Sequence, residues 1–211
     1  SIFKYILILF LYSINNEWNL TIYTTQKNKE KYLEVLDDLN VKGKINIINN
    51  ISNKKDYSNL LKNNYFWKDM NEEYCLLFQY DSLAFKKFDN KFFSFNYLGA
   101  RWPEHITQVK NIYNGNGGTS LRNINIMKFI TSKYDYNLHG FNKNGDDLPE
   151  DVYFAKYMDI ENLNKVDFDI LDEFSFECIY NEKSTYGHAI YESIDLNNLE
   201  EYITNRINKI L

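Results

Sequence analysis

The turn after the apolar run EYCLLF (73–78) carries the first residues whose types and spacing could support chemistry. Gln79 and Asp81 are two positions apart, so on a strand their side chains would point to the same face. A carboxylate at a strand end could hold a hard divalent cation, which takes oxygen ligands. The same carboxylate could instead cap a turn with Ser82. Spacing alone leaves both interpretations open.

A second acidic pair, Glu150 and Asp151, opens the segment PEDVYFAKYM (149–158) after a polar stretch that contains Gly140 and Gly145. Proline and acids at this point favour a helix start. Asp151 could serve as a general base at the edge of a cleft, provided that burial or a charged neighbour tunes its pKa. An acid in this position could also be only a helix cap or a partner of the helix dipole.

Two further features could belong to a site. His188 could ligate a metal through one ring nitrogen, although a lone histidine can equally be a core or surface residue. The segment GNGGTSLRN (115–123) holds three of the eight glycines, which indicates a backbone that needs positive φ or approaches something closely. It matches neither the phosphate-binding P-loop pattern nor the G-x-G-x-x-G pattern of dinucleotide folds.

The elements that must position these residues alternate between helix and strand in the first half of the chain, which predicts an α/β fold with a buried, mostly parallel sheet. We predict one domain over residues 1–211, because no linker or repeat divides the chain. Helices are predicted at 1–14, 27–39, 58–70, 124–134, 149–158 and 196–211, and strands at 19–25, 44–49, 73–81, 97–103 and 118–123.

Composition excludes several classes of protein. Of the 211 residues 44% are hydrophobic and 17% aromatic, which excludes a disordered chain. The net charge of −5 comes without a basic stripe, which argues against a nucleic-acid partner. The apolar run at the start is shorter than the roughly 20 residues of a membrane span and lacks a signal-peptide cleavage site. The two distant cysteines, Cys75 and Cys178, favour buried reduced thiols, so a soluble, cytoplasmic protein is predicted. The abundance of Asn, Lys and Ile indicates an AT-rich genome, as in a large DNA virus or a protist.

Taken in order, several short segments resemble the DUF5672 family of glycosyltransferase-like proteins, over about residues 60 to 190. The resemblance is carried by FQYDS (78–82), YLGARWP (97–103), NGGTSLR (116–122), PEDVYF (149–154), FSFE (174–177) and the pair Gly187-His188. Such proteins are similar to GT-A glycosyltransferases, α/β folds that bind a nucleotide-sugar with a divalent metal. Two departures are that Arg101 replaces a proline before Trp102, and that Gly187 and His188 are adjacent rather than spaced by one.

The resemblance implies a set of roles. Asp81 and His188 would ligate Mn²⁺ or Mg²⁺, and Asp151 would be the base that deprotonates the acceptor hydroxyl. The donor and acceptor would be bound by Gln79, Asp81, Trp102, Asn116, Gly117, Gly118, Arg122 and Glu150. GT-A folds also begin with a strand that cradles the nucleotide base, whereas this sequence begins with the predicted helix. That strand could lie before residue 1, could be truncated, or could be missing at a cost to donor binding.

The leading functional hypothesis is therefore a metal-dependent, inverting glycosyltransferase that uses a nucleotide-sugar, with UDP-sugars as the first candidates, and a hydroxyl acceptor. The alternative is a non-catalytic glycan-binding or scaffold module with the same fold. A sugar-nucleotide hydrolase is a third possibility, which would release nucleotide without help from an acceptor.

Overall fold

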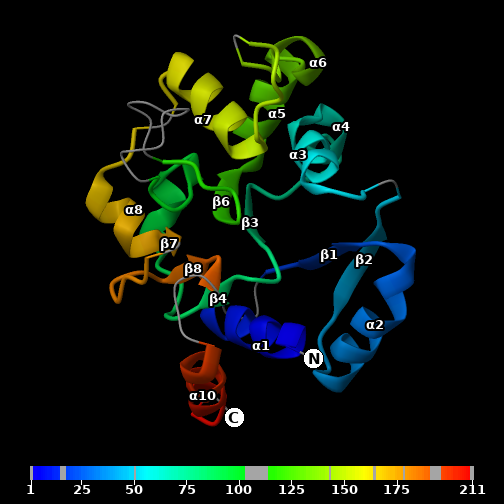
Figure 1. Ribbon diagram of the computed structural model, residues 1–211, viewed down its shortest axis with the longest axis vertical. Helices are drawn as coiled ribbons and strands as arrows, with labels where there is room; N and C mark the ends of the chain where they lie inside the picture. Colours follow the sequence, from blue (N-terminus) through cyan, green and yellow to red (C-terminus); the bar gives the residue numbers. More distant parts are fainter. Residues whose placement is uncertain are drawn as a thin grey trace.

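A computed structural model describes residues 2–14, 18–49, 51–102, 114–142, 144–163, 165–177, 179–190 and 196–209 (Figure 1). Helices and short strands alternate in the first half of this part of the chain, whereas α5 to α8 follow one another directly in the second half. In order they are α1 (Ile2–Ile14), β1 (Leu20–Thr24), η1 (Gln26–Asn28), α2 (Lys29–Asp38), β2 (Gly43–Ile47), α3 (Lys54–Lys62), α4 (Asn64–Trp67), β3 (Tyr74–Phe78), β4 (Leu83–Ala84), η2 (Asn90–Ser94), β5 (Tyr97–Leu98), β6 (Thr119–Asn123), α5 (Ile124–Lys133), α6 (Tyr136–His139), α7 (Glu150–Ile160), α8 (Phe168–Phe174), β7 (Ser175–Glu177), β8 (Tyr186–His188) and α10 (Leu196–Ile207).

Asparagine caps mark where α3, α4 and α5 begin. The Asn53 side chain accepts a hydrogen bond from the Asp56 amide, so α3 starts at Lys54, four residues before the predicted start. Asn123 accepts from the amides of Asn125 and Ile126, and this cap converts β6 directly into α5, as predicted.

The described strands form three small sheets. β1 pairs with β2 in parallel, β6 lies between β3 and β5 and is antiparallel to both, and β8 pairs with β4 antiparallel and with β7 in parallel. The mixed α/β class is confirmed. These pairings do not show a single, mostly parallel sheet, because β6 returns antiparallel along β3.

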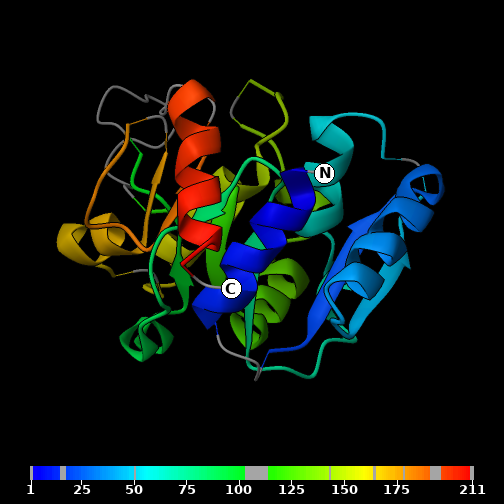
Figure 2. The same cartoon turned by 90° about the horizontal axis from the view of Figure 1, so that it is seen from below.

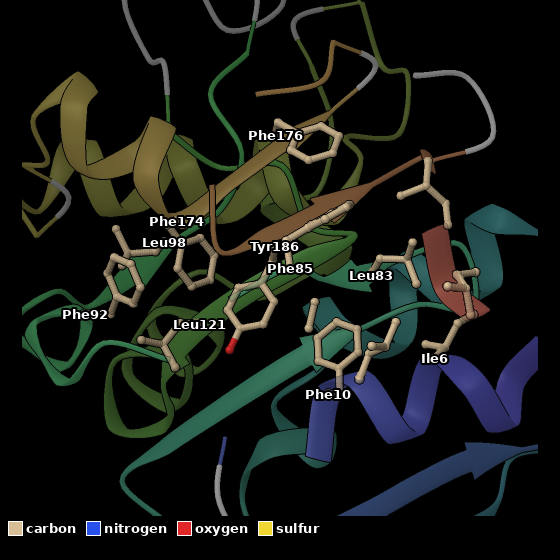
Figure 3. Packing of buried hydrophobic residues seen from close by; sticks show 14 of the residues in the cluster. Ile6, Phe10, Leu83, Phe85, Phe92, Leu98, Leu121, Phe174, Phe176 and Tyr186 are labelled. Atoms are coloured by element: carbon tan, nitrogen blue, oxygen red, sulfur yellow. The ribbon is translucent and has the colours of Figure 1, made fainter. Parts of the chain in front are cut away.

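The largest core cluster lies between α1 and the strands of the second and third sheets (Figure 3). Phe10 of α1 is stacked on Phe78 of β3, with ring centroids 3.9 Å apart, and lies parallel to the ring of Tyr186 of β8 at 5.4 Å. One helix face thereby joins β3 to β8, the two strands that lead into the candidate site.

Two other clusters complete the interior. Trp67, Tyr97, Met127 and Phe154 belong to the cluster that packs α4, α5 and α7 against the second sheet. A smaller cluster around Leu7 and Ile22 joins α1 to β1, α2 and β2, which lie to one side of the other elements (Figures 1 and 2). Among the described residues, no helix is long and apolar enough to cross a membrane.

Candidate functional site

His188 lies between two carboxylates at the ends of short strands. The parallel register of β7 and β8 sets Glu177 beside His188, and the His188 Nδ1 atom is 3.1 Å from Glu177 Oε1. On the other side of the ring, His188 Nε2 is 3.4 Å from Asp81 Oδ1. A backbone bond from the Ile190 amide to the Asp81 carbonyl (3.2 Å) fixes the Asp81 turn next to β8.

Ser82, rather than Asp81, closes the turn after β3. The Ser82 amide donates to the Gln79 carbonyl (3.1 Å), and the Gln79 amide donates to the Ser82 hydroxyl (3.2 Å). Asp81 Oδ1 is buried and has no hydrogen-bond partner among the described residues, and the same holds for His188 Nε2. The carboxylate is therefore not used by the turn and faces the histidine.

The charges of this cluster are coupled. Burial alone would lower the pKa of His188, but its contacts with Asp81 and Glu177 outweigh burial and raise that pKa to about 9. Burial would raise the pKa of Asp81, yet the contact with His188 lowers it on balance. With no cation bound, the expected state at neutral pH is an imidazolium between two carboxylates.

The glycine-rich segment forms the wall against which the histidine ring packs. A Cβ on Gly118 would lie 2.2 Å from three atoms of the His188 ring, which is far inside contact distance. Asn116 holds this wall in place, because it donates to Glu177 Oε2 (2.5 Å) and accepts from the Gly118 amide (3.1 Å). Gly118 is therefore needed for the close approach of protein groups, which is the second of the two reasons the sequence indicated, whereas Gly115 has the positive φ that is the first.

Next to His188, Ala189 has a backbone φ of +50°. Residues other than glycine seldom adopt this left-handed conformation, and such strained positions cluster at functional sites. The strain lies at the point where the chain leaves β8 and turns back toward Asp81.

Arg122 and Glu150 form a buried ion pair beneath the same wall. The Arg122 side chain has no exposed surface; its Nη1 donates to Glu150 Oε2 (2.8 Å) and its Nη2 to Glu150 Oε1 (3.0 Å). Its Nε donates to the Ser120 hydroxyl (2.9 Å), and the guanidinium lies 4.9 Å from the Tyr97 ring centroid. Gly117 is required here as well, since its Cβ would lie 1.9 Å from Glu150 Oε1.

Asp151 follows Glu150 in the first turn of α7. Its Oδ2 accepts a long hydrogen bond from the Gly117 amide (3.4 Å), and its Oδ1 accepts from the Val152 amide (2.8 Å). Burial and the neighbouring charge of Glu150 raise its pKa to about 7. A carboxylate with this pKa can both accept and release a proton near neutral pH, as a general base must.

Most of the predicted site residues line one cavity of about 2490 Å³. They are Gln79, Asp81, Asn116, Gly117, Gly118, Glu150, Asp151 and His188. Trp102 lies elsewhere: it is buried and packs against Gly115, where a Cβ would be 2.6 Å from its ring. Arg122 is also outside the lining. Contact of these two residues with a bound donor remains a prediction, and the structure gives both of them packing roles.

Glu177 is the site residue that the sequence did not single out. It contacts both His188 and Asn116 and lines the cavity. The sequence feature that could have indicated Glu177 was the segment FSFE (174–177). This segment was part of the resemblance, but no role was assigned to its glutamate. Among the described residues, no group of three or more His, Cys, Asp or Glu side chains converges to hold a metal ion. Asp81 and His188 alone would offer two ligands.

The fold and the site define an α/β protein in which acidic residues, one histidine and a glycine-rich wall meet at the end of a cleft. The sequence matches the family described as protein of unknown function (DUF5672) over residues 43–189, and the chain belongs to this family. A comparison with curated proteins gives no match.

Proposed function

We propose that the protein is a metal-dependent glycosyltransferase that moves a sugar from a nucleotide-sugar, such as a UDP-sugar, to a hydroxyl acceptor. The observation that carries the proposal is that two buried atoms, Asp81 Oδ1 and His188 Nε2, face each other at 3.4 Å without hydrogen-bond geometry and share one cavity with Asp151, whose pKa is raised. Buried polar atoms without a hydrogen bond are rare in proteins, and a bound ion is one of the explanations for them.

The residues fit a divalent cation. Two potential ligand atoms 3.4 Å apart face each other, and Glu177 contacts the other ring nitrogen of His188, as carboxylates do behind metal-binding histidines. Oxygens of a diphosphate and water would complete the ligand set, which is usual for Mg²⁺ and Mn²⁺ at phosphate sites. The bound cation would stabilise the negative charge that grows on the leaving diphosphate.

The protein's own groups would carry the proton and set the geometry. The acceptor hydroxyl oxygen bonds to the anomeric carbon of the sugar while the bond from that carbon to the diphosphate oxygen breaks, and the bonding pair leaves with the nucleoside diphosphate. Asp151 accepts the hydroxyl proton. A single displacement of this kind inverts the anomeric configuration.

The fold is compatible with a GT-A-like arrangement, which belongs to the same proposal. β1 and β2 are parallel, with α2 between them in sequence, and the Asp81 turn follows the carboxyl end of β3. Ligands of α/β folds gather at such strand ends. β6, antiparallel to β3, brings the glycine-rich wall to the same end.

A thermal-shift screen tests the proposal. Mn²⁺ together with a panel of nucleotide-sugars at about 100 times Kd should add about 2.7 kcal/mol of stability. For a chain of this size the melting temperature should then rise by about 5 to 10 °C with the matching donor. The variant Asp81→Asn should lose most of this rise. Asp37→Asn, an exposed change on α2 away from the cavity, should keep it.

Two outcomes would count against the proposal. If no donor raises the melting temperature, the protein has no nucleotide-sugar site. If the melting temperature of Asp81→Asn rises as much as that of the original chain, Asp81 does not take part in binding. If a donor binds but no acceptor sugar is ever glycosylated, the non-catalytic glycan-binding module becomes the better interpretation.

A further inference from the structure

Lys62, the last residue of α3, places its ammonium group in the interior of the protein. Its side chain has no exposed surface, and its Nζ donates a hydrogen bond to the Leu148 carbonyl (2.7 Å). Asp147 Oδ1 lies 3.6 Å from the same nitrogen, which is longer than a charge-assisted hydrogen bond. Burial lowers the pKa of Lys62, and the Asp147 charge offsets this effect only in part. The lysine is therefore buried at a cost to the fold.

Leu148, which accepts the bond from Lys62, is the last residue before Pro149 and the start of α7. The Leu148 amide donates to the carbonyl of Gly140, the residue that ends α6 (2.7 Å). Both backbone groups of Leu148 are thus bonded, one to the end of α6 and the other to the end of α3. Leu148 is also buried, so these two bonds fix where the chain enters α7.

α7 begins at a residue that cannot cap it with a side chain. Its N-cap is Pro149, whose ring has no polar atom that could accept a hydrogen bond from the helix amides. Two buried cations instead hold the residues on either side of this proline: Lys62 bonds to Leu148, and Arg122 pairs with Glu150. The next residue is Asp151, so both contacts help to determine where its carboxylate lies.

α3 also forms part of the cavity wall. Its lining residues are Lys54, Tyr57, Ser58 and Leu61. Lys62 extends toward Leu148 instead and is completely covered. A covered side chain does not touch a substrate in the cavity, so Lys62 can influence the site only through the residues that it holds.

We propose that Lys62 is a positioning residue for Asp151, because it ties the segment in front of α7 to α3 and so keeps the first turn of α7 beside the Gly117 amide. This role rests on the proposed function, in which Asp151 is the general base. Stability alone does not account for the lysine, since a methionine of similar length would spare the fold the cost of a buried charge. The lysine donor, however, satisfies the Leu148 carbonyl and fixes that segment.

The experiment compares the original chain with Lys62→Met and Lys55→Met. The first variant removes the bond to Leu148 and keeps the length of the side chain. Lys55→Met is the matched control, because Lys55 pairs with the same Asp147 (3.0 Å) from two turns earlier in α3, but 67% of its side chain is exposed. The pKa of Asp151 is measured by carbon NMR of its carboxyl group, which Asp151→Asn assigns. This measurement needs no donor, metal or acceptor.

Lys62→Met should lower the pKa of Asp151 by about 1 or more from its value of about 7, because a looser first turn of α7 admits water to the carboxylate. The Gly117 amide resonance should move as well, since this amide donates to Asp151. The melting temperature should change by only a few degrees, because the lost hydrogen bond is offset by the absence of a buried charge. Turnover should fall about 10- to 100-fold with an unchanged KM for the donor. Lys55→Met should match the original chain in every measurement.

Two results would overturn the role of Lys62. If Lys62→Met melts at a lower temperature but keeps the pKa of Asp151 and the Gly117 resonance, the lysine is only structural. If Lys55→Met changes them equally, the charge beside Asp147 is responsible, and not the bond to Leu148. Should Lys62→Met not fold, Lys62→Gln replaces it, because the glutamine amide ends one bond short of the lysine nitrogen. If even the original chain transfers no sugar, the proposed function fails, whereas the NMR measurements still decide on Lys62.

Discussion

At the residue scale, the charge of Asp151 depends on its surroundings at the start of α7. Because burial raises its pKa to about 7, Asp151 is a carboxylate only above that pH, and only there could it act as the proposed base. We expect the turnover rate to rise with pH through about 7 and then level off. Asp151→Asn should lower kcat by about 10²- to 10⁴-fold, the usual contribution of a general base, while donor binding persists. Steady-state kinetics between pH 5 and 9 measure both effects.

The same substitution has an opposite effect on stability. A carboxyl whose pKa is raised in the folded state stabilises the fold while it is protonated, and that contribution is lost as the pH rises through about 7. Asp151→Asn should therefore be more stable than the original chain at pH 8, by on the order of 2–4 kcal/mol, and the difference should vanish near pH 4. Urea unfolding measures it. A variant that is less stable at pH 8 would contradict the burial of a charged Asp151.

Sequence reasoning found the acids of the site because strand ends and helix starts are marked locally. Asp81 follows an apolar strand, and Asp151 follows a proline at a helix start. The residues alone marked His188 as a possible ligand, but only the resemblance joined it to Asp81, and Glu177 was given no role. Their roles depend on the pairing of β7 with β8, which have three residues each. The sequence of such a short strand does not indicate with which other strand it pairs.

At the element scale, the pair of Arg122 and Glu150 joins β6 to the first turn of α7. Arg122 lies in the middle of the cluster of Trp67, Tyr97 and Phe154, and Glu150 is the carboxylate that pairs with its guanidinium. Burial would lower the pKa of Arg122, but the Glu150 charge raises it on balance. The ion pair between Arg122 and Glu150 fixes the first turn of α7 on β6, and thereby places Asp151 next to the Gly117 amide.

Glu150→Gln should destabilise the protein by about 3–5 kcal/mol, because it leaves a buried guanidinium without its carboxylate. The double change Arg122→Met with Glu150→Leu should recover much of that loss, since a buried pair replaced by apolar groups is often tolerated. Urea unfolding gives both values. Asp38→Asn, which removes the exposed partner of Lys4, is the control and should have little effect. A double variant as unstable as Glu150→Gln would show that the pair itself is required.

Most elements were predictable because each has a local pattern: the apolar run of α1, the β-branched run of β1 and the apolar run of β3. β4, β7 and β8 were missed, since two or three residues carry no periodicity. The direction of β6 was also hidden. The sequence pattern of a strand that follows a glycine turn is the same whether the strand pairs in parallel or antiparallel. Only the register of β6 against β3 in the structure shows that the pairing is antiparallel.

At the scale of the whole molecule, the buried hydrophobic residues form two large clusters and one small one. Two large clusters hold β3 to β8 and the helices around them. β1, α2 and β2 pack on α1 through a smaller cluster whose buried members, among the residues that the structure describes, are Leu7, Ile22, Val35 and Leu36. The family match begins at residue 43, so it includes β2 but not β1 or α2. A two-stranded sheet is a weak unit by itself.

We therefore expect local opening of the β1 and β2 pair before global unfolding. The Ile22 amide, which points toward β2, should exchange at least tenfold faster than the Leu121 amide in β6, which is fully buried between β3 and β5. Hydrogen exchange in low concentrations of urea separates the two cases, because Leu121 should follow the global unfolding free energy and Ile22 should not. Equal protection of the two amides at every urea concentration would mean that one cooperative unit spans all three sheets. The small cluster on α1 would then be enough to couple β1 to the rest of the chain.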